Sequence, residues 1–194
     1  LKSIMRYNRK EGFEDHFNCF RSYVLGDETA LLMAAYPGDR PKNPFPYFTE
    51  VMTGFEWTAA IGMLYEGMVD EGLACIEAIR SRYDGRRRNP YDEAECGHHY
   101  ARAMAAWSAA LALTGFHYSA VTKSIEFACP EKPVTWFWAS GYAWGSCDID
   151  PQGTVTISVL AGDISLESVA IKGLGSASVS AQLTAGDEIS VTVG

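Results

Sequence analysis

The sequence lacks three features that would each point to a class of protein. Its cysteines include no CxxC pair and are odd in number, so neither a zinc site nor a complete disulfide framework is indicated. No uninterrupted apolar run approaches the roughly 20 residues that a membrane-spanning helix needs. Basic residues are few, because 16 Lys and Arg accompany 24 Asp and Glu and give a net charge of -8. This charge argues against nucleic acid or an anionic membrane as the main partner.

The amino-terminal residues show no signal-peptide pattern, because Lys2 and Arg6 follow Leu1 without an apolar stretch. Together with the odd cysteine count, this favours a reducing compartment, and we expect a cytoplasmic location. A start at Leu rather than Met suggests a processed chain or an excised piece. The composition, 47% apolar and 21% charged, is ordinary for a globular protein.

Three segments have the periodicity of helices. Between Val51 and Tyr65 only Glu56 is charged, which predicts a helix covered on most sides. The stretch Val69–Tyr83 carries one apolar stripe and is predicted to be an amphipathic surface helix. From about Gly97 to Thr114 the sequence is rich in Ala and apolar nearly all round, which is typical of a buried helix. The order inner, outer, inner indicates two concentric layers of helices, as in an α/α toroid.

After Phe116 the period changes to two, and glycines separate the alternating runs, which predicts antiparallel strands joined by tight turns. This part is also almost free of Lys and Arg, so we place a boundary near Val121. The expected fold is α+β: partial (α/α)6 toroid helices in residues 1–121, followed by an antiparallel β module in residues 122–194. A closed ring of six helical hairpins needs on the order of 300 residues. We therefore expect an incomplete ring that self-associates or packs on a missing amino-terminal part.

Ionisable groups gather beside the apolar helix expected after Gly97. Arg102 is its only fixed charge and lies close to the helix N-terminus, where the macrodipole disfavours a cation. A buried charge without a partner costs several kcal/mol, so we expect a counter-ion from Asp92, Glu93 or Glu95, one loop upstream. The cluster is either a ligand site or a structural ion pair that fixes the loop.

Several motifs occur in a fixed order along the chain. They are Phe45–Trp57 (FPYFTEVMTGFEW), Tyr65–Met68 (YEGM), Arg82–Arg86 (RYDGR), Asn89–Pro90 and Glu93–Met104 (EAECGHHYARAM). Together they resemble glycoside hydrolase family 116, the family of the non-lysosomal glucosylceramidase and of microbial β-glucosidases. The resemblance runs from near Tyr7 to Phe116 and continues loosely to Gly145.

The resemblance implies a retaining β-glycosidase of the six-hairpin type that acts on a small β-glycoside. We expect no cofactor, and no metal either, because the adjacent His98 and His99 point in different directions on a helix. The resemblance also implies that Glu93 and Arg102 hold glucose hydroxyls in the −1 subsite. A carboxylate and a guanidinium suit vicinal hydroxyls, since one accepts a hydrogen bond and the other donates one. Glu56 is a candidate third contact, and His98 is a candidate to line the site. Trp57 either stacks on the sugar ring or packs in the core.

The catalytic carboxylates are not among the matching residues. Retaining hydrolysis needs a nucleophile and an acid/base group about 5–5.5 Å apart, and in family 116 both lie upstream of the region that matches. We therefore expect the carboxy-terminal portion of a β-glucosidase, inactive alone, with membrane contact not expected from this segment. The alternatives are a non-catalytic carbohydrate-binding fragment and an autonomous hydrolase that uses Glu56 and Glu93.

One further group of residues has two interpretations. Five aromatic residues follow the expected boundary: Trp136, Phe137, Trp138, Tyr142 and Trp144. Such rings bind the C–H face of a sugar in some proteins and fill the cores of sheets in others. Because the run lies where helices give way to strands, we favour packing.

Overall fold

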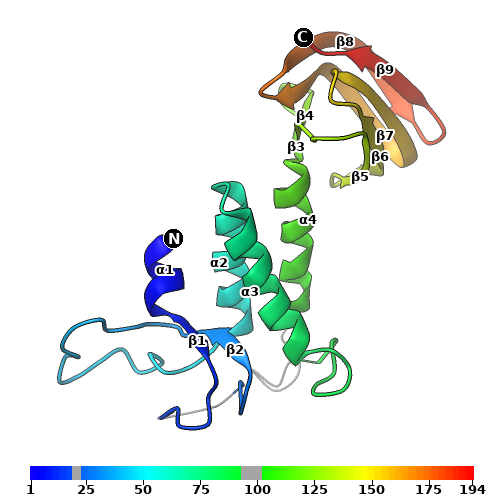
Figure 1. Cartoon of the computed structure of the whole chain (residues 1–194). Coiled ribbons are helices and arrows are strands. Elements are labelled where there is room, and N and C mark those ends of the chain that lie inside the picture. The colour runs from blue at the N-terminus through cyan, green and yellow to red at the C-terminus, as the bar shows by residue number, and fades with distance from the viewer. Residues whose placement is uncertain (19–22, 93–101) are drawn as a thin grey trace. The chain divides into compact units, whose positions relative to one another are not determined.

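The computed structural model describes residues 1–18, 23–92 and 102–194 (Figure 1). Its contacts divide the chain into two compact units, residues 1–109 and 110–194. The division falls inside helix α4 (Trp107–Thr114), upstream of the boundary expected at residue 121.

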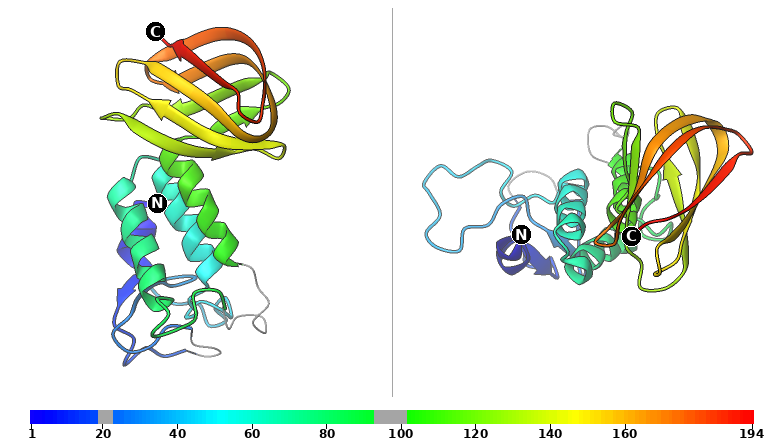
Figure 2. Two further views of the ribbon diagram at one scale, coloured as in Figure 1. Left: turned by 90° about the vertical axis from the view of Figure 1, so that its right-hand side faces the viewer. Right: turned by 90° about the horizontal axis from the view of Figure 1, so that it is seen from above.

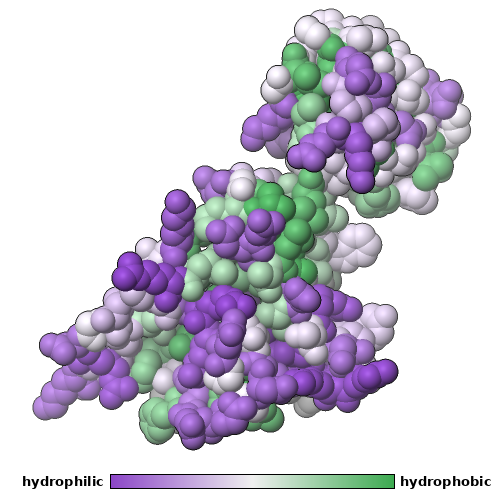
Figure 3. Space-filling model, in the orientation of Figure 1, coloured by the Kyte–Doolittle hydropathy of each residue, from purple (hydrophilic) through white to green (hydrophobic). Residues whose placement is uncertain are grey.

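The first unit is built on two antiparallel neighbours, α2 (Thr53–Tyr65) and α3 (Val69–Arg82). It also contains α1 (Lys2–Tyr7), the 3-10 helix η1 (Arg102–Ala106), and a small antiparallel sheet of β1 (Arg9–Glu11) and β2 (Thr29–Leu31). Two of the three predicted helices, Val51–Tyr65 and Val69–Tyr83, are confirmed to within two residues at each end. Hydrophobic surface lies along the helices, whereas hydrophilic side chains dominate the loops around β1 and β2 (Figure 3).

Helices α2 and α3 lie close together because their contact is lined by small and apolar residues. Ala60 and Met63 of α2 are fully buried and form one cluster with Cys75 of α3. Gly72 allows the closest approach, since a Cβ atom there would lie 2.8 Å from the Leu64 side chain. The predicted amphipathic character of α3 is confirmed only in part. Its carboxylates and Arg80 lie outside the core, but the predicted apolar stripe is not the buried face, because Val69 and Leu73 are exposed. The buried face consists of Gly72, Cys75, Ile79 and Arg82.

The second unit is a curled seven-stranded sheet (Figure 2). Its strands are β3 (His117–Ser119), β4 (Ser124–Ala128), β5 (Val134–Ala139), β6 (Ala143–Ile149), β7 (Thr154–Lys172), β8 (Gly175–Thr184) and β9 (Glu188–Thr192). The central strand is β7, whose first half pairs with β6 and β9 and whose second half pairs with β4 and β8. This long strand passes through the whole curl, so the inner faces of both halves enclose one core.

That core follows from the two-residue period of the strands. Alternate side chains of β6 and β7 are buried, and the fully buried set includes Phe127, Trp138, Cys147, Val155 and Ile157. Most of the intervening residues are polar and point outwards, and Trp144 and Leu160 are exposed apolar exceptions.

The expected fold class is wrong in two respects. The chain is mostly a curled mixed sheet with four short α-helices in the described residues, and not a partial (α/α)6 toroid. The last of these helices is not an enclosed inner helix, because Met104 in η1 is 67% exposed and Trp107 in α4 is 66% exposed. The β module is not purely antiparallel either, since β4 pairs with β7 in parallel register. Apolar composition predicted burial here, but nothing in the described residues covers these side chains.

Candidate functional site

The structure describes only part of the predicted sugar site. Glu93 and His98 lie outside the described residues. Arg102 begins η1, and its side chain likewise lies outside the described part. Glu56 and Trp57 are fully described, and both lie in α2.

Glu56 forms a buried ion pair with Arg82, in the last turn of α3. The two side chains are 2% and 1% exposed. Oε2 of Glu56 accepts a hydrogen bond from Nη2 of Arg82, and Oε1 accepts one from the backbone N–H of Leu31 at 2.9 Å. Nη1 of Arg82 donates to the carbonyl oxygen of Thr29 at 2.5 Å. The pair therefore ties α2, α3 and β2 together.

The electrostatics of this pair are dominated by burial. Burial raises the pKa of Glu56 above its ordinary value, although the charge of Arg82 and the Leu31 amide act in the opposite direction. Nε of Arg82 is buried and has no hydrogen-bond partner among the described residues. In this arrangement both Glu56 oxygens are engaged by the protein, so the carboxylate serves to join the helices.

A second group of charges holds the turn that follows α3. Glu28 accepts hydrogen bonds from both terminal nitrogens of Arg88, with Nη2 at 2.9 Å. The neighbouring Asp27 binds Arg87 through both of its oxygens, at 2.9 and 3.2 Å. Asp84 closes the turn itself by accepting from the backbone N–H of residues 86 and 87 at 2.8 Å.

These contacts fix the chain just upstream of the Glu93–Arg102 segment. Burial of Glu28 would raise its pKa, but the hydrogen bonds from Arg88 and from the Leu25 amide outweigh this and leave the pKa below its ordinary value. Sequence reasoning missed Asp27 and Glu28 as partners of the arginines. The available signal was two adjacent carboxylates and a run of three arginines sixty residues apart, which spacing alone cannot connect.

Trp57 is buried at 4% exposure, which is the environment that core packing requires. Its indole offers no open face to a ligand in this arrangement. Open aromatic rings occur at other positions, which include Phe55 and Tyr65 of α2, Trp107 near the end of the first unit, and Phe137, Tyr142 and Trp144 in the second unit.

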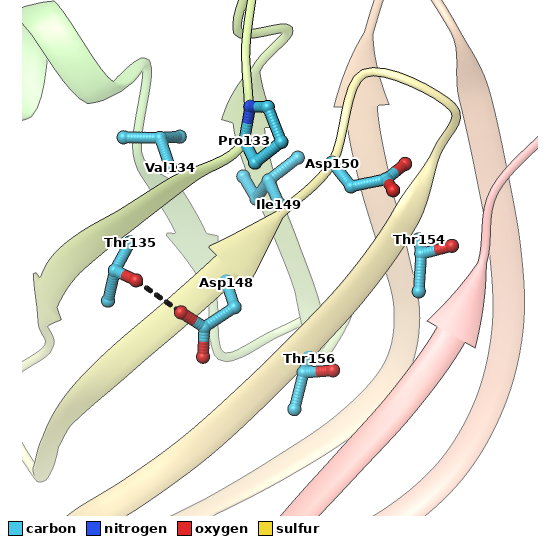
Figure 4. Close-up of a pocket in the computed structure, with 8 residues that line it drawn as sticks. All are labelled: Pro133, Val134, Thr135, Asp148, Ile149, Asp150, Thr154 and Thr156. Carbon is cyan, nitrogen blue, oxygen red and sulfur yellow. Dashed lines mark hydrogen bonds between the residues drawn. The ribbon is translucent and has the colours of Figure 1, made fainter.

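The second unit carries a polar hollow of about 310 Å³ on its outer surface (Figure 4). The hollow lies over the ends of β5, β6 and β7, and its polar lining consists of Thr135, Asp148, Asp150, Thr154 and Thr156. Thr135 donates a hydrogen bond to Oδ1 of Asp148. Asp150 is occupied by its own turn, since it accepts from the backbone N–H of Gln152 at 2.7 Å.

The aromatic run beside this hollow divides between the two faces of the sheet. Trp138 is fully buried and donates from Nε1 to the carbonyl oxygen of Ser146 at 3.0 Å, and Trp136 packs against the core. Phe137 and Trp144 lie on the outer face with ring centroids 6.2 Å apart. Tyr142 is also exposed, at 79%. The expected packing role therefore holds for Trp136 and Trp138 and not for the other three rings.

Other kinds of site find no support in the part of the chain that the structure covers. Within residues 1–18, 23–92 and 102–194, no cluster of His, Cys, Asp and Glu is suited to a metal ion. No described helix has the length and apolar character needed to cross a membrane. Cys75, Cys129 and Cys147 are free thiols.

Comparison with known proteins adds no assignment. No protein-family model matches the chain, and no curated protein matches it significantly. The resemblance to glycoside hydrolase family 116 thus stays a prediction based on motifs.

Proposed function

We propose that the chain is the carboxy-terminal portion of a retaining β-glycosidase acting on β-glucosides, and that it supplies sugar-binding groups of the −1 subsite. The observation that carries the proposal is the ordered series of motifs ending in Glu93–Met104, in which Glu93 and Arg102 provide a carboxylate and a guanidinium for vicinal hydroxyls.

The anchoring of the preceding turn supports this proposal. Glu28 and Asp27 bind Arg88 and Arg87, and so fix the residues from which the chain leads into the Glu93 motif. Substrate-holding groups need such support, because a binding group must be held to within about 0.5 Å of its productive position.

In this proposal the nucleophile and the acid/base carboxylate belong to other parts of the enzyme. A nucleophile or acid/base carboxylate must reach the substrate, and Glu56 is buried with both oxygens engaged. This speaks against the autonomous hydrolase based on Glu56 and Glu93. The alternative that remains is a non-catalytic carbohydrate-binding fragment. We place either protein in the cytoplasm, on the ground of its odd number of cysteines.

The test is to titrate the chain with a glucose-mimicking iminosugar and to measure the binding affinity by calorimetry. We expect Glu93→Gln and Arg102→Lys each to weaken binding by about tenfold, the scale of one lost charge-assisted contact. Glu77→Gln is the control, because Glu77 is an exposed carboxylate on α3. Absence of binding, or equal binding by all variants, would overturn the proposal.

A parallel assay with a chromogenic β-glucoside addresses catalysis. We expect no turnover by the chain alone, because neither catalytic carboxylate is assigned to it. Turnover abolished by Glu93→Gln would show that the chemistry resides in this chain and would contradict the proposed division of roles.

A further inference from the structure

The outer face of the sheet formed by β5, β6, the first half of β7 and β9 has an unusual surface. The register aligns its outward side chains in rows that cross the strands. One row is Thr135, Asp148, Thr156 and Ser190, and the next is Phe137, Ser146, Ser158 and Glu188. We call this surface the outer β face. It is a continuous band of hydroxyls with two carboxylates and an aromatic corner.

The aromatic corner is formed by Phe137 of β5 and Trp144 of β6. These rings are 49% and 45% exposed, and their planes meet at 41° with the centroids 6.2 Å apart. Large aromatic rings on a sheet normally turn inwards, as Trp138 does here. A pair left half exposed provides an apolar platform of the size of a sugar ring, against which the C–H face of a pyranose can pack.

The polar groups lie along the same face at a distance that suits a chain of sugars. Trp144 and Asp148 are four residues apart on β6, which corresponds to about 13 Å at the rise of a β-strand. Thr156 and Ser190 pair their hydroxyls at 2.7 Å, and the hollow of about 310 Å³ lies next to them.

Asp148 is one of the two carboxylates on this surface and the one that lines the hollow. Its Oδ1 accepts from Thr135, while its second oxygen points away from Thr135 and accepts no hydrogen bond from the described residues (Figure 4). A carboxylate oxygen open to solvent can accept a charge-assisted hydrogen bond from a sugar hydroxyl.

The negative charge of the outer β face favours neutral ligands over anionic ones. Its two rows contain two carboxylates and no Lys or Arg. Phosphorylated, sulfated or carboxylated polymers, and nucleic acid, would be repelled. A neutral saccharide meets no such penalty and offers hydroxyls to the band and an apolar ring face to the corner.

The geometry points to the outer β face as a binding surface for neutral oligosaccharides, with Phe137 and Trp144 as the stacking platform and Asp148 as a hydroxyl acceptor. The surface lies within residues 134–190 and contains none of the residues assigned to the −1 subsite. This inference therefore does not depend on the proposed glycosidase function.

The test measures binding of the full chain to a panel of neutral β-glucan and β-xylan oligosaccharides, and to acidic polysaccharides for comparison, at concentrations up to the millimolar range. Saturation-transfer NMR gives the contacted sugar protons, and calorimetry gives the affinity. We expect binding by at least one neutral oligosaccharide. Trp144→Ala should weaken it by about tenfold or more, the scale of a central aromatic contact, and Asp148→Asn should weaken it less.

The matched control is Tyr142→Ala. Tyr142 is a more exposed aromatic residue of the same unit, but it lines a different hollow, together with Lys123 and Ser165. Its removal should leave affinity unchanged. A purely structural role of the Phe137–Trp144 pair would lower the thermal midpoint without changing affinity, so both quantities are recorded for each variant.

Three results would overturn the inference: no binding by any neutral oligosaccharide, binding that Trp144→Ala leaves intact, or a preference for acidic polysaccharides. Glu93→Gln separates this surface from the −1 subsite. Oligosaccharide binding that survives Glu93→Gln and fails with Trp144→Ala belongs to the outer β face, whereas the opposite pattern assigns all binding to the −1 subsite and refutes the inference.

Discussion

The Glu56–Arg82 pair should be a main determinant of the stability of the first unit. We consider the substitution Glu56→Gln, which keeps the size of the side chain and removes its charge. Glu56 accepts from two donors with two different oxygens, Nη2 of Arg82 and the Leu31 amide. Glutamine has a single oxygen, so one donor must face its NH2 group in either orientation.

The expected cost follows from leaving Arg82 charged and buried at 1% exposure. Removing one partner of a buried ion pair destabilises proteins by about 3–5 kcal/mol. The double variant Glu56→Gln with Arg82→Met removes the unpaired charge as well. Its free energy of unfolding should therefore be higher than that of Glu56→Gln alone, which is a strong departure from additivity.

The assay has to report on the first unit separately, since the two units need not unfold together. Amide hydrogen exchange at rising urea concentration, read on peptides that cover residues 53–82, gives the free energy of opening of α2 and α3. Asp27→Asn is the control, because it breaks the exposed pair with Arg87 in the same unit and should produce no measurable change.

Two outcomes would refute this reasoning. The first is a loss below about 1 kcal/mol for Glu56→Gln, which would place the pair in the range of surface salt bridges. The second is a double variant less stable than the single one, because the unpaired charge of Arg82 would then not be the source of the cost.

Three further predictions concern both units. Gly145→Ala should destabilise the sheet by about 1–3 kcal/mol in urea unfolding, because its Cβ would lie 1.9 Å from a backbone oxygen of β7, whereas Gly141→Ala, with open space around it, should not. The pKa of Glu28 is lowered in the folded state. The contribution of this carboxylate to the free energy of unfolding is therefore complete above the unfolded pKa of about 4.3 and is lost as the pH falls through the folded pKa. Glu28→Gln should reduce the loss of stability at acid pH, as measured by hydrogen exchange, and an unchanged pH dependence would count against the ion pair. In iodoacetamide labelling read by mass spectrometry, exposed Cys129 should react in the native protein, while Cys147, whose pKa is raised by burial, should react only after unfolding.

Helices and strands could be predicted from local pattern, but their assembly could not. The run from Thr53 to Tyr65 and the alternation from Thr154 to Val159 both reappear as expected. Periodicity identifies which side of an element is apolar and does not identify what covers it. Trp107 illustrates the difference, since an apolar helix predicted an enclosed position and the side chain is 66% exposed.

The parallel pairing of β4 with β7 was missed for a related reason. Short strands separated by tight turns favour antiparallel neighbours, and that inference holds for the β5–β6 and β7–β8 pairs. Ser124–Ala128 instead pairs with residues 168–172, more than forty positions away, and no local signal encodes so distant a partner. The 19-residue length of β7, which lets one strand serve both halves of the curl, was likewise invisible in a sequence punctuated by Gly162.

The ion-pair partner of Glu56 could have been predicted from the sequence alone. A carboxylate in an apolar helix requires a cation, and the next helix in the chain ends in Arg80 and Arg82, where the macrodipole favours positive charge. Two antiparallel helices joined by a short turn bring the start of the first close to the end of the second, so position 56 and position 82 necessarily come near each other. The helix-hairpin argument does not apply to Glu93, for which the sequence offers Arg102 as the expected charge partner. Because both oxygens of Glu56 are engaged by the protein, Glu56 is the weaker candidate for a sugar contact, and Glu93 with Arg102 stays the predicted one.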